Sequence, residues 1–74
     1  MKLNDILKKI GNFGTTTKVI VKESGKIIAT EPNLQDTLGF KAGSFEYLAG
    51  INAKQYKVES FTVTDHTLIF NVSQ

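Results

Sequence analysis

Apolar residues near the start of the chain repeat at the spacing of one helix face. Leu3, Ile6, Leu7 and Ile10 stand at positions i, i+3, i+4 and i+7, which is the pattern of an amphipathic helix. Gly11 follows them and is a common residue just after a helix end. The spacing therefore predicts a helix over residues 3–10. Because two turns of helix are not stable alone in water, we expect its apolar face to pack on another element.

The next segment has the composition of a β-hairpin. Residues 15–23 are rich in β-branched side chains, with Val19, Ile20 and Val21 at the centre, as is typical of a strand. Ser24-Gly25 is a two-residue turn signal. Residues 26–30 then form the predicted returning strand.

Both faces of this hairpin carry apolar residues. The register expected for a two-residue turn places one set of side chains on the first face: Val19, Val21 and Ile28. The second face is predicted to carry Ile20, Lys22, Ile27 and Ala29. Since one layer of short helices covers one face of a sheet, we expect the second face to serve self-association or a partner. The alternative is that the central part of the chain wraps across it.

The centre of the chain is the least regular part. Glu31-Pro32-Asn33 ends the second strand, since proline cannot donate to a strand ladder. Residues 34–38 have the pattern of one helical turn. Residues 44–49 could form another, because Ser44 suits a helix start and Gly50 suits a helix stop. We predict one or two short helices here.

A second hairpin is expected at the C-terminal end. Residues 54–64 and 67–72 alternate as strands around a tight turn at Asp65-His66. This turn sets Val63 opposite Leu68 and Phe61 opposite Phe70, with Val72 on the same apolar face. Thr62, Thr64, Thr67, Ile69 and Asn71 lie on the other face. The alternation slips at Glu59-Ser60, where we expect a β-bulge.

These elements predict the α+β fold class. The order is α-β-β-α-β-β, with a short N-terminal helix, one or two short central helices and an antiparallel sheet of about four strands made from two hairpins. The 74 residues are too few for more than one domain, so residues 1–74 form a single small domain.

The residue types needed for catalysis or metal binding are scarce. There is no cysteine and there is one histidine, His66, so disulfides and a structural zinc site are not expected. Asp65-His66 fits a turn better than half of a catalytic dyad. Asp36 and Glu46 are not brought together by any motif, and Gly11-Asn12-Phe13-Gly14 lacks the lysine and the flanking elements of a phosphate-binding loop. We expect no enzyme activity and no cofactor.

The charge and the hydropathy of the chain limit which classes of partner are expected. The net charge is +2, and all nine basic residues are lysines. Arginine is the preferred residue for bidentate phosphate and base contacts, so its absence disfavours a dedicated nucleic-acid binder. Lysines also alternate with acids, as at Lys22-Glu23 and Lys57-Val58-Glu59. The chain has no apolar run long enough to cross a membrane and no secretory signal pattern. We expect a cytoplasmic protein that does not contact membranes.

Four segments carry a resemblance to a group of proteins: Leu3-Asn4-Asp5-Ile6-Leu7, Thr17-Lys18-Val19-Ile20-Val21, Glu59-Ser60-Phe61-Thr62-Val63 and Thr67-Leu68-Ile69-Phe70-Asn71-Val72. In their order and type they resemble small proteins encoded by phages and mobile elements of Gram-positive bacteria. The resemblance implies a helix, a hairpin, a linking helix and a closing hairpin. Some such proteins block host defence by binding a nuclease or sequestering a nucleotide signal. The segment from Lys41 to Lys54 departs from that layout, and the resemblance assigns no residue a role.

We therefore expect a non-enzymatic protein-interaction module that uses the face of Ile20, Lys22, Ile27 and Ala29. The resemblance implies a phage-type accessory protein that inhibits a host protein such as a defence nuclease, and a homo-oligomer is also open. The alternative function is binding of a small ligand such as a nucleotide, or of single-stranded nucleic acid. Lysines beside aromatic residues, as in Phe40-Lys41 and Tyr56-Lys57, suit that alternative.

The expected lack of catalysis is testable. The purified protein should hydrolyse no nucleotide, peptide or ester substrate above the rate of a buffer control, because no nucleophile, base and orienting group are brought together by a motif. Turnover assays across these substrate classes check this. A reproducible activity that disappears in the His66→Ala variant would contradict it.

Overall fold

The N-terminal helix forms where the apolar spacing predicts it. In a computed structural model, which describes residues 1–9, 18–34 and 46–74, helix α1 spans Leu3–Lys9. Leu3 and Leu7 are buried, and the two lysines at its end suit the negative end of the helix dipole. The Leu3 amide donates to the Tyr56 carbonyl at 2.9 Å, which ties the helix start to the C-terminal half of the chain. Ile10 lies outside the described residues.

The first hairpin consists of β1 (Lys18–Glu23) and β2 (Lys26–Glu31). Ser24 and Gly25 both have positive φ, 53° and 79°, as a type I′ hairpin turn requires. The predicted register is wrong beyond Lys22. Ile28 has no partner in β1 and forms a bulge, so Ala29 pairs with Val21 and is buried, while Ile20 pairs with Thr30. Ala29 therefore lies on the opposite face from the one predicted.

The second hairpin, β5 (Lys57–Thr64) and β6 (Thr67–Ser73), confirms its predicted register. Phe61 pairs with Phe70 and Val63 with Leu68, across a turn in which His66 has φ 51°. The register shifts between Val58 and Ser60, which confirms the bulge at Glu59.

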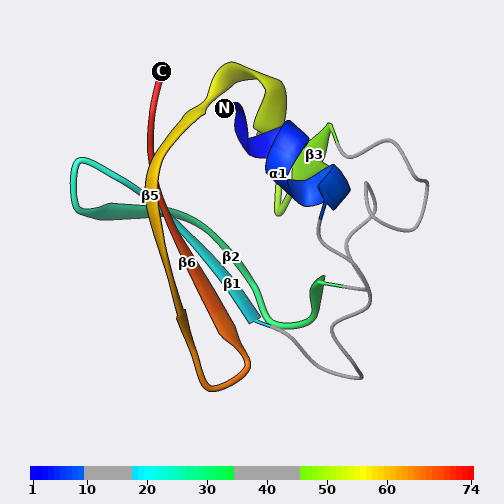
Figure 1. Ribbon diagram of the computed structural model, residues 1–74, viewed down its shortest axis with the longest axis vertical. Coiled ribbons are helices and arrows are strands. Elements are labelled where there is room, and N and C mark those ends of the chain that lie inside the picture. The colour runs from blue at the N-terminus through cyan, green and yellow to red at the C-terminus, as the bar shows by residue number, and fades with distance from the viewer. Residues whose placement is uncertain (10–17, 35–45) are drawn as a thin grey trace.

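The two hairpins join in one sheet through a parallel pair of strands. The strand order is β2-β1-β6-β5, and β1 runs parallel to β6 while the outer pairs are antiparallel (Figure 1). The fully antiparallel sheet expected from the sequence is thus corrected. Parallel neighbours need a long crossover, and the residues between β1 and β6 supply it. The Lys18 amide donates to the His66 carbonyl at 2.7 Å where the pairing begins.

Residues 46–49 do not form the predicted helix, and residues 54–55 do not belong to the predicted strand, since β5 begins at Lys57. Instead β3 (Tyr47–Leu48) and β4 (Ile51–Asn52) pair as a small antiparallel hairpin, followed by the 3-10 helix η2 (Ala53–Gln55). Ala49 and Gly50 have φ values of 49° and 89°, so the predicted helix stop is the centre of a tight turn. The remaining expected helical positions, 35–38 and 44–45, lie outside the described residues.

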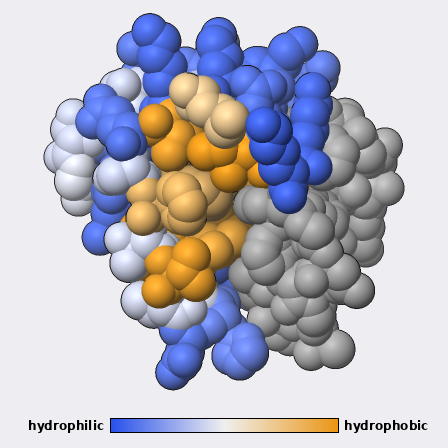
Figure 2. Space-filling view, viewed as in Figure 1, coloured by the Kyte–Doolittle hydropathy of each residue, from blue (hydrophilic) through white to orange (hydrophobic). Residues whose placement is uncertain are grey.

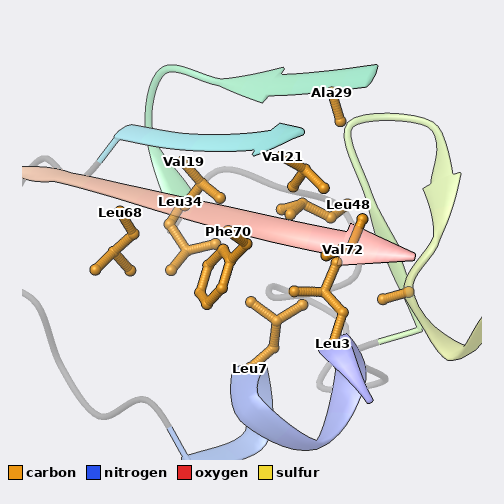
Figure 3. Packing of buried hydrophobic residues seen from close by; sticks show 11 residues of the cluster. Leu3, Leu7, Val19, Val21, Ala29, Leu34, Leu48, Leu68, Phe70 and Val72 are labelled. Carbon is orange, nitrogen blue, oxygen red and sulfur yellow. The ribbon is translucent and has the colours of Figure 1, made fainter. Parts of the chain in front are cut away.

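The core lies between one side of the sheet and α1. Figure 3 shows side chains of β1 and β6 directed toward Leu3 and Leu7 of the helix, with Leu34 and Leu48 beside them. The buried sheet residues are Val19, Val21, Ala29, Leu68, Phe70 and Val72. We call this the inner side of the sheet. The outer side carries the alternating strand positions, among them Ile20, Lys22, Ile69 and Thr62.

Replacement of the central aromatic residue should be far more damaging than replacement of its strand partner. Phe70 is 1% exposed, and a buried Phe→Ala change costs about 3–5 kcal/mol, which is comparable to the net stability of a domain of this size. Phe61 is 57% exposed and contributes mainly a ring contact with Phe70, worth about 0.5–1.5 kcal/mol. Thermal melts should show Phe70→Ala largely unfolded and Phe61→Ala folded. Equal losses would contradict this burial.

A buried amide in α1 predicts a stabilising substitution. Asn4 is 7% exposed, and its side-chain oxygen is buried without a hydrogen-bond partner among residues 1–9, 18–34 and 46–74. An unsatisfied buried polar group costs about 1–3 kcal/mol. Asn4→Leu, which has the same number and branching of side-chain heavy atoms, should therefore raise the melting temperature, whereas Asp5→Leu at a half-buried position of the same helix should not. A lower melting temperature for Asn4→Leu would show that the amide is satisfied in solution.

Candidate functional site

The inner side of the sheet is not covered along β5. Phe61 and Val63 are 57% and 63% exposed, although their strand partners Phe70 and Leu68 are 1% and 6% exposed. The Phe61 ring lies 5.9 Å from the Phe70 ring, tilted by 40°, so it continues the core outward to the surface. Figure 2 shows apolar surface gathered on the face where β5 lies in Figure 1. We call Phe61 and Val63 the β5 apolar strip.

This strip lies on a partly free sheet edge. β5 is the last strand of the sheet, and residues before α1 pair with its first part. Lys2 bridges to Lys57, and the Val58 amide donates to the Met1 carbonyl at 2.9 Å. Residues 59–64 have no further strand neighbour among the described residues. Unpaired backbone groups along such an edge can accept another strand.

The outer side of the sheet is less apolar than the sequence led us to expect. Thr30, Ile20, Ile69 and Thr62 form one row across the strands, and Ile27, Lys22, Asn71 and Ser60 form the next. The Asn71 side-chain amide donates to the Ser60 hydroxyl at 3.1 Å. Ile20, Lys22 and Ile27 of the predicted face share this side, but Ala29 does not. The bulge at Ile28 moves Ala29 to the inner side.

Strand alternation separates charges that are mixed in the sequence. Lys18 and Lys22 lie at outer-side positions of β1, whereas Glu23 alternates with Val19 and Val21 on the inner side. Glu31 pairs with Val19 and follows the same alternation. Lys57 pairs with Ser73, which places it on the outer side as well. The lysines on the outer side of the sheet are therefore not interleaved with acids, whereas on the inner side Glu23 stands opposite Lys26.

The other candidate residues do not converge. His66 and Asp65 are exposed in a turn, and Glu46 pairs with Lys54 at 3.3 Å. Tyr47 is 51% exposed, and Tyr56 is half-buried against the core. Asp36, Phe40 and Lys41 lie outside the described residues. Within the described ranges, no three His, Asp or Glu side chains are placed to hold a metal ion.

The sequence did not identify Phe61 and Val63 as surface residues. Their alternation with Thr62 and Thr64 is that of a core-facing strand, and it places them on the correct side of the sheet. Whether such a strand is central or at the edge depends on how distant strands pair, which the alternation does not encode.

No helix in the part of the chain that the structure describes is long and apolar enough to span a bilayer.

Comparison with known proteins adds no assignment to this geometry. No protein-family model, no curated protein and no solved structure matches the chain.

Proposed function

We propose that this protein is a non-enzymatic protein-interaction module, and that its partner adds an extended segment to the free edge of β5. The observation that carries the proposal is the exposure of Phe61 and Val63 on the side of the sheet that elsewhere forms the core. Strand addition would pair the backbone of residues 59–64 and place partner side chains beside the β5 apolar strip. This is a recurrent mode of peptide recognition.

The charges at the ends of the free edge favour a different chain over a second copy. A two-fold pairing about Thr62 would set Phe61 opposite Val63 of the second copy, twice. It would also set Glu59 opposite Asp65, twice. Apolar cross-strand pairs contribute about 0.2–1 kcal/mol each, and like charges directly opposite are destabilising, so the two effects largely offset. A partner strand that has apolar residues at its centre and lysine or arginine at both ends would form the apolar pairs and would also attract Glu59 and Asp65.

The resemblance noted in the sequence extends the proposal to the origin of the partner. A small phage-type accessory protein would use this edge on a host protein, such as a defence nuclease, and block it by occupying its surface. An extended segment with apolar residues at alternate positions and basic residues at both ends is the feature to seek in that host protein.

A designed peptide tests the edge directly. It carries valines at alternate positions and a lysine at each end, and it is titrated into labelled protein while backbone amide shifts are followed by NMR. Shifts should concentrate at residues 59–64. The double variant Phe61→Lys, Val63→Lys should bind at least about tenfold more weakly, since it removes the apolar strip and repels the lysines.

The matched control is the double variant Thr62→Lys, Thr64→Lys. It adds the same charge to the same strand on the outer side of the sheet, and it should retain most of the affinity. The proposal is wrong if millimolar peptide leaves the β5 amides unshifted, or if both double variants lose affinity equally.

A further inference from the structure

The outer side of the sheet gathers positive charge. Lys18 and Lys22 lie on β1, and Lys57 lies two strands away on β5. Lys2 pairs with Lys57 in the N-terminal bridge, so its side chain is on the same side. None of the four forms an ion pair with a described carboxylate. The regularly paired outer positions of the sheet contain no Asp or Glu.

The bridge between Lys2 and Lys57 places two lysines directly opposite each other. Residues directly opposite in an antiparallel pair have Cβ atoms about 4.5–5.5 Å apart, and like charges there are destabilising. An anion between the two ammonium groups would reverse the sign of this interaction. The pairing of Lys2 with Lys57 is thus a second feature, besides the strand alternation that places Lys18 and Lys22, that gathers positive charge on the outer side.

Neutral hydrogen-bonding groups fill the space between the lysines. Thr30, Thr62, Thr64 and Thr67 carry hydroxyls, and Ser60 and Asn71 form a hydrogen-bonded pair beside Lys22. The half-buried Ile20 and Ile69 are neighbours at the centre. Lysines, hydroxyls and amides are the groups that contact phosphate and sugar in nucleic-acid complexes.

We propose that the outer side of the sheet binds single-stranded nucleic acid through its phosphate backbone. Charge complementarity and spacing argue for this occupant. Lys18 and Lys22 are about 13 Å apart along β1, and β5 lies about 10 Å across the sheet, so the lysines match a linear polyanion and not one phosphate. The Ile20–Ile69 pair offers an apolar floor for unpaired bases, which a duplex would not expose.

The residue types on the outer side also determine how strong, how sequence-specific and how salt-dependent the proposed nucleic-acid binding is. The outer-side positions of β2, β1, β6 and β5 hold no aromatic or arginine side chain, so base stacking and bidentate base contacts on this side contribute nothing. Binding is therefore weak, indifferent to sequence and steeply dependent on salt. It does not involve the inner-side strip of Phe61 and Val63, so it stands apart from the proposed strand addition.

The test measures fluorescence anisotropy of a labelled oligothymidine of fifteen nucleotides with the full chain. Binding with a Kd of about 100 µM or tighter is expected at 50 mM salt. Each phosphate contact to a single strand contributes about −0.7 to the log–log salt slope. Three to four contacts predict a loss of about 20- to 50-fold between 50 and 200 mM salt.

A matched pair of double variants locates the site. Lys18→Gln, Lys22→Gln should weaken binding about tenfold at 50 mM salt and make the slope shallower by about 1.4. Lys8→Gln, Lys9→Gln removes the same charge from α1, on the other side of the sheet, and should change binding less than about threefold. Glu59 is the exposed bulge residue near Lys57, so Glu59→Gln should strengthen binding. This variant gives a gain that loss of folding cannot imitate.

Three results would overturn the proposal. One is a Kd above 1 mM at 50 mM salt, and another is an equal loss in the two double variants. The third is competition by polyglutamate as effective as that by unlabelled oligothymidine, which would make the surface a general anion site and not a nucleic-acid site.

Discussion

The fold depends on the pairing of β1 with β6. These two strands come from opposite halves of the chain, and their parallel pairing turns two separate hairpins into one sheet. An isolated two-stranded hairpin is marginal in water. Side by side, Val19 and Val21 meet Leu68 and Phe70 on one surface, which is wide enough for α1 to cover. Without that pairing, neither hairpin nor the two-turn helix would have a core to bury.

The sequence predicts well what is decided locally. The apolar spacing located α1, the Ser24-Gly25 turn located the first hairpin, and the Asp65-His66 turn fixed the register of the second. The slip in alternation at Glu59 also identified its bulge correctly. Each of these follows from backbone geometry within a few residues. The strand alternation also identified Phe70 as a core residue, and the helical spacing identified Leu3 and Leu7 as the residues of α1 that pack on the sheet.

The features that the sequence did not predict depend on contacts between distant residues, or on turn residues that are compatible with two different local structures. Ala29 changes sides because Ile28 forms a bulge that packs against the core, and the hairpin pattern does not reveal it. Ala49-Gly50 suits a helix end or a hairpin turn, and the structure has the turn. The order β2-β1-β6-β5 decides that β5 is an edge. The exposure of Phe61 follows from that order and not from its neighbours in sequence.

The short bridge before α1 has a consequence for stoichiometry. By pairing with residues 56–58, the N-terminal residues cover the first part of the β5 edge and leave residues 59–64 free. At the opposite edge, the bulge at Ile28 interrupts β2, and bulges hinder strand addition. Addition of strands at both edges of a sheet builds open filaments, whereas addition at one edge ends with one partner. If a partner strand adds to the β5 edge as proposed, this arrangement of the two edges favours a closed one-to-one complex over a growing filament.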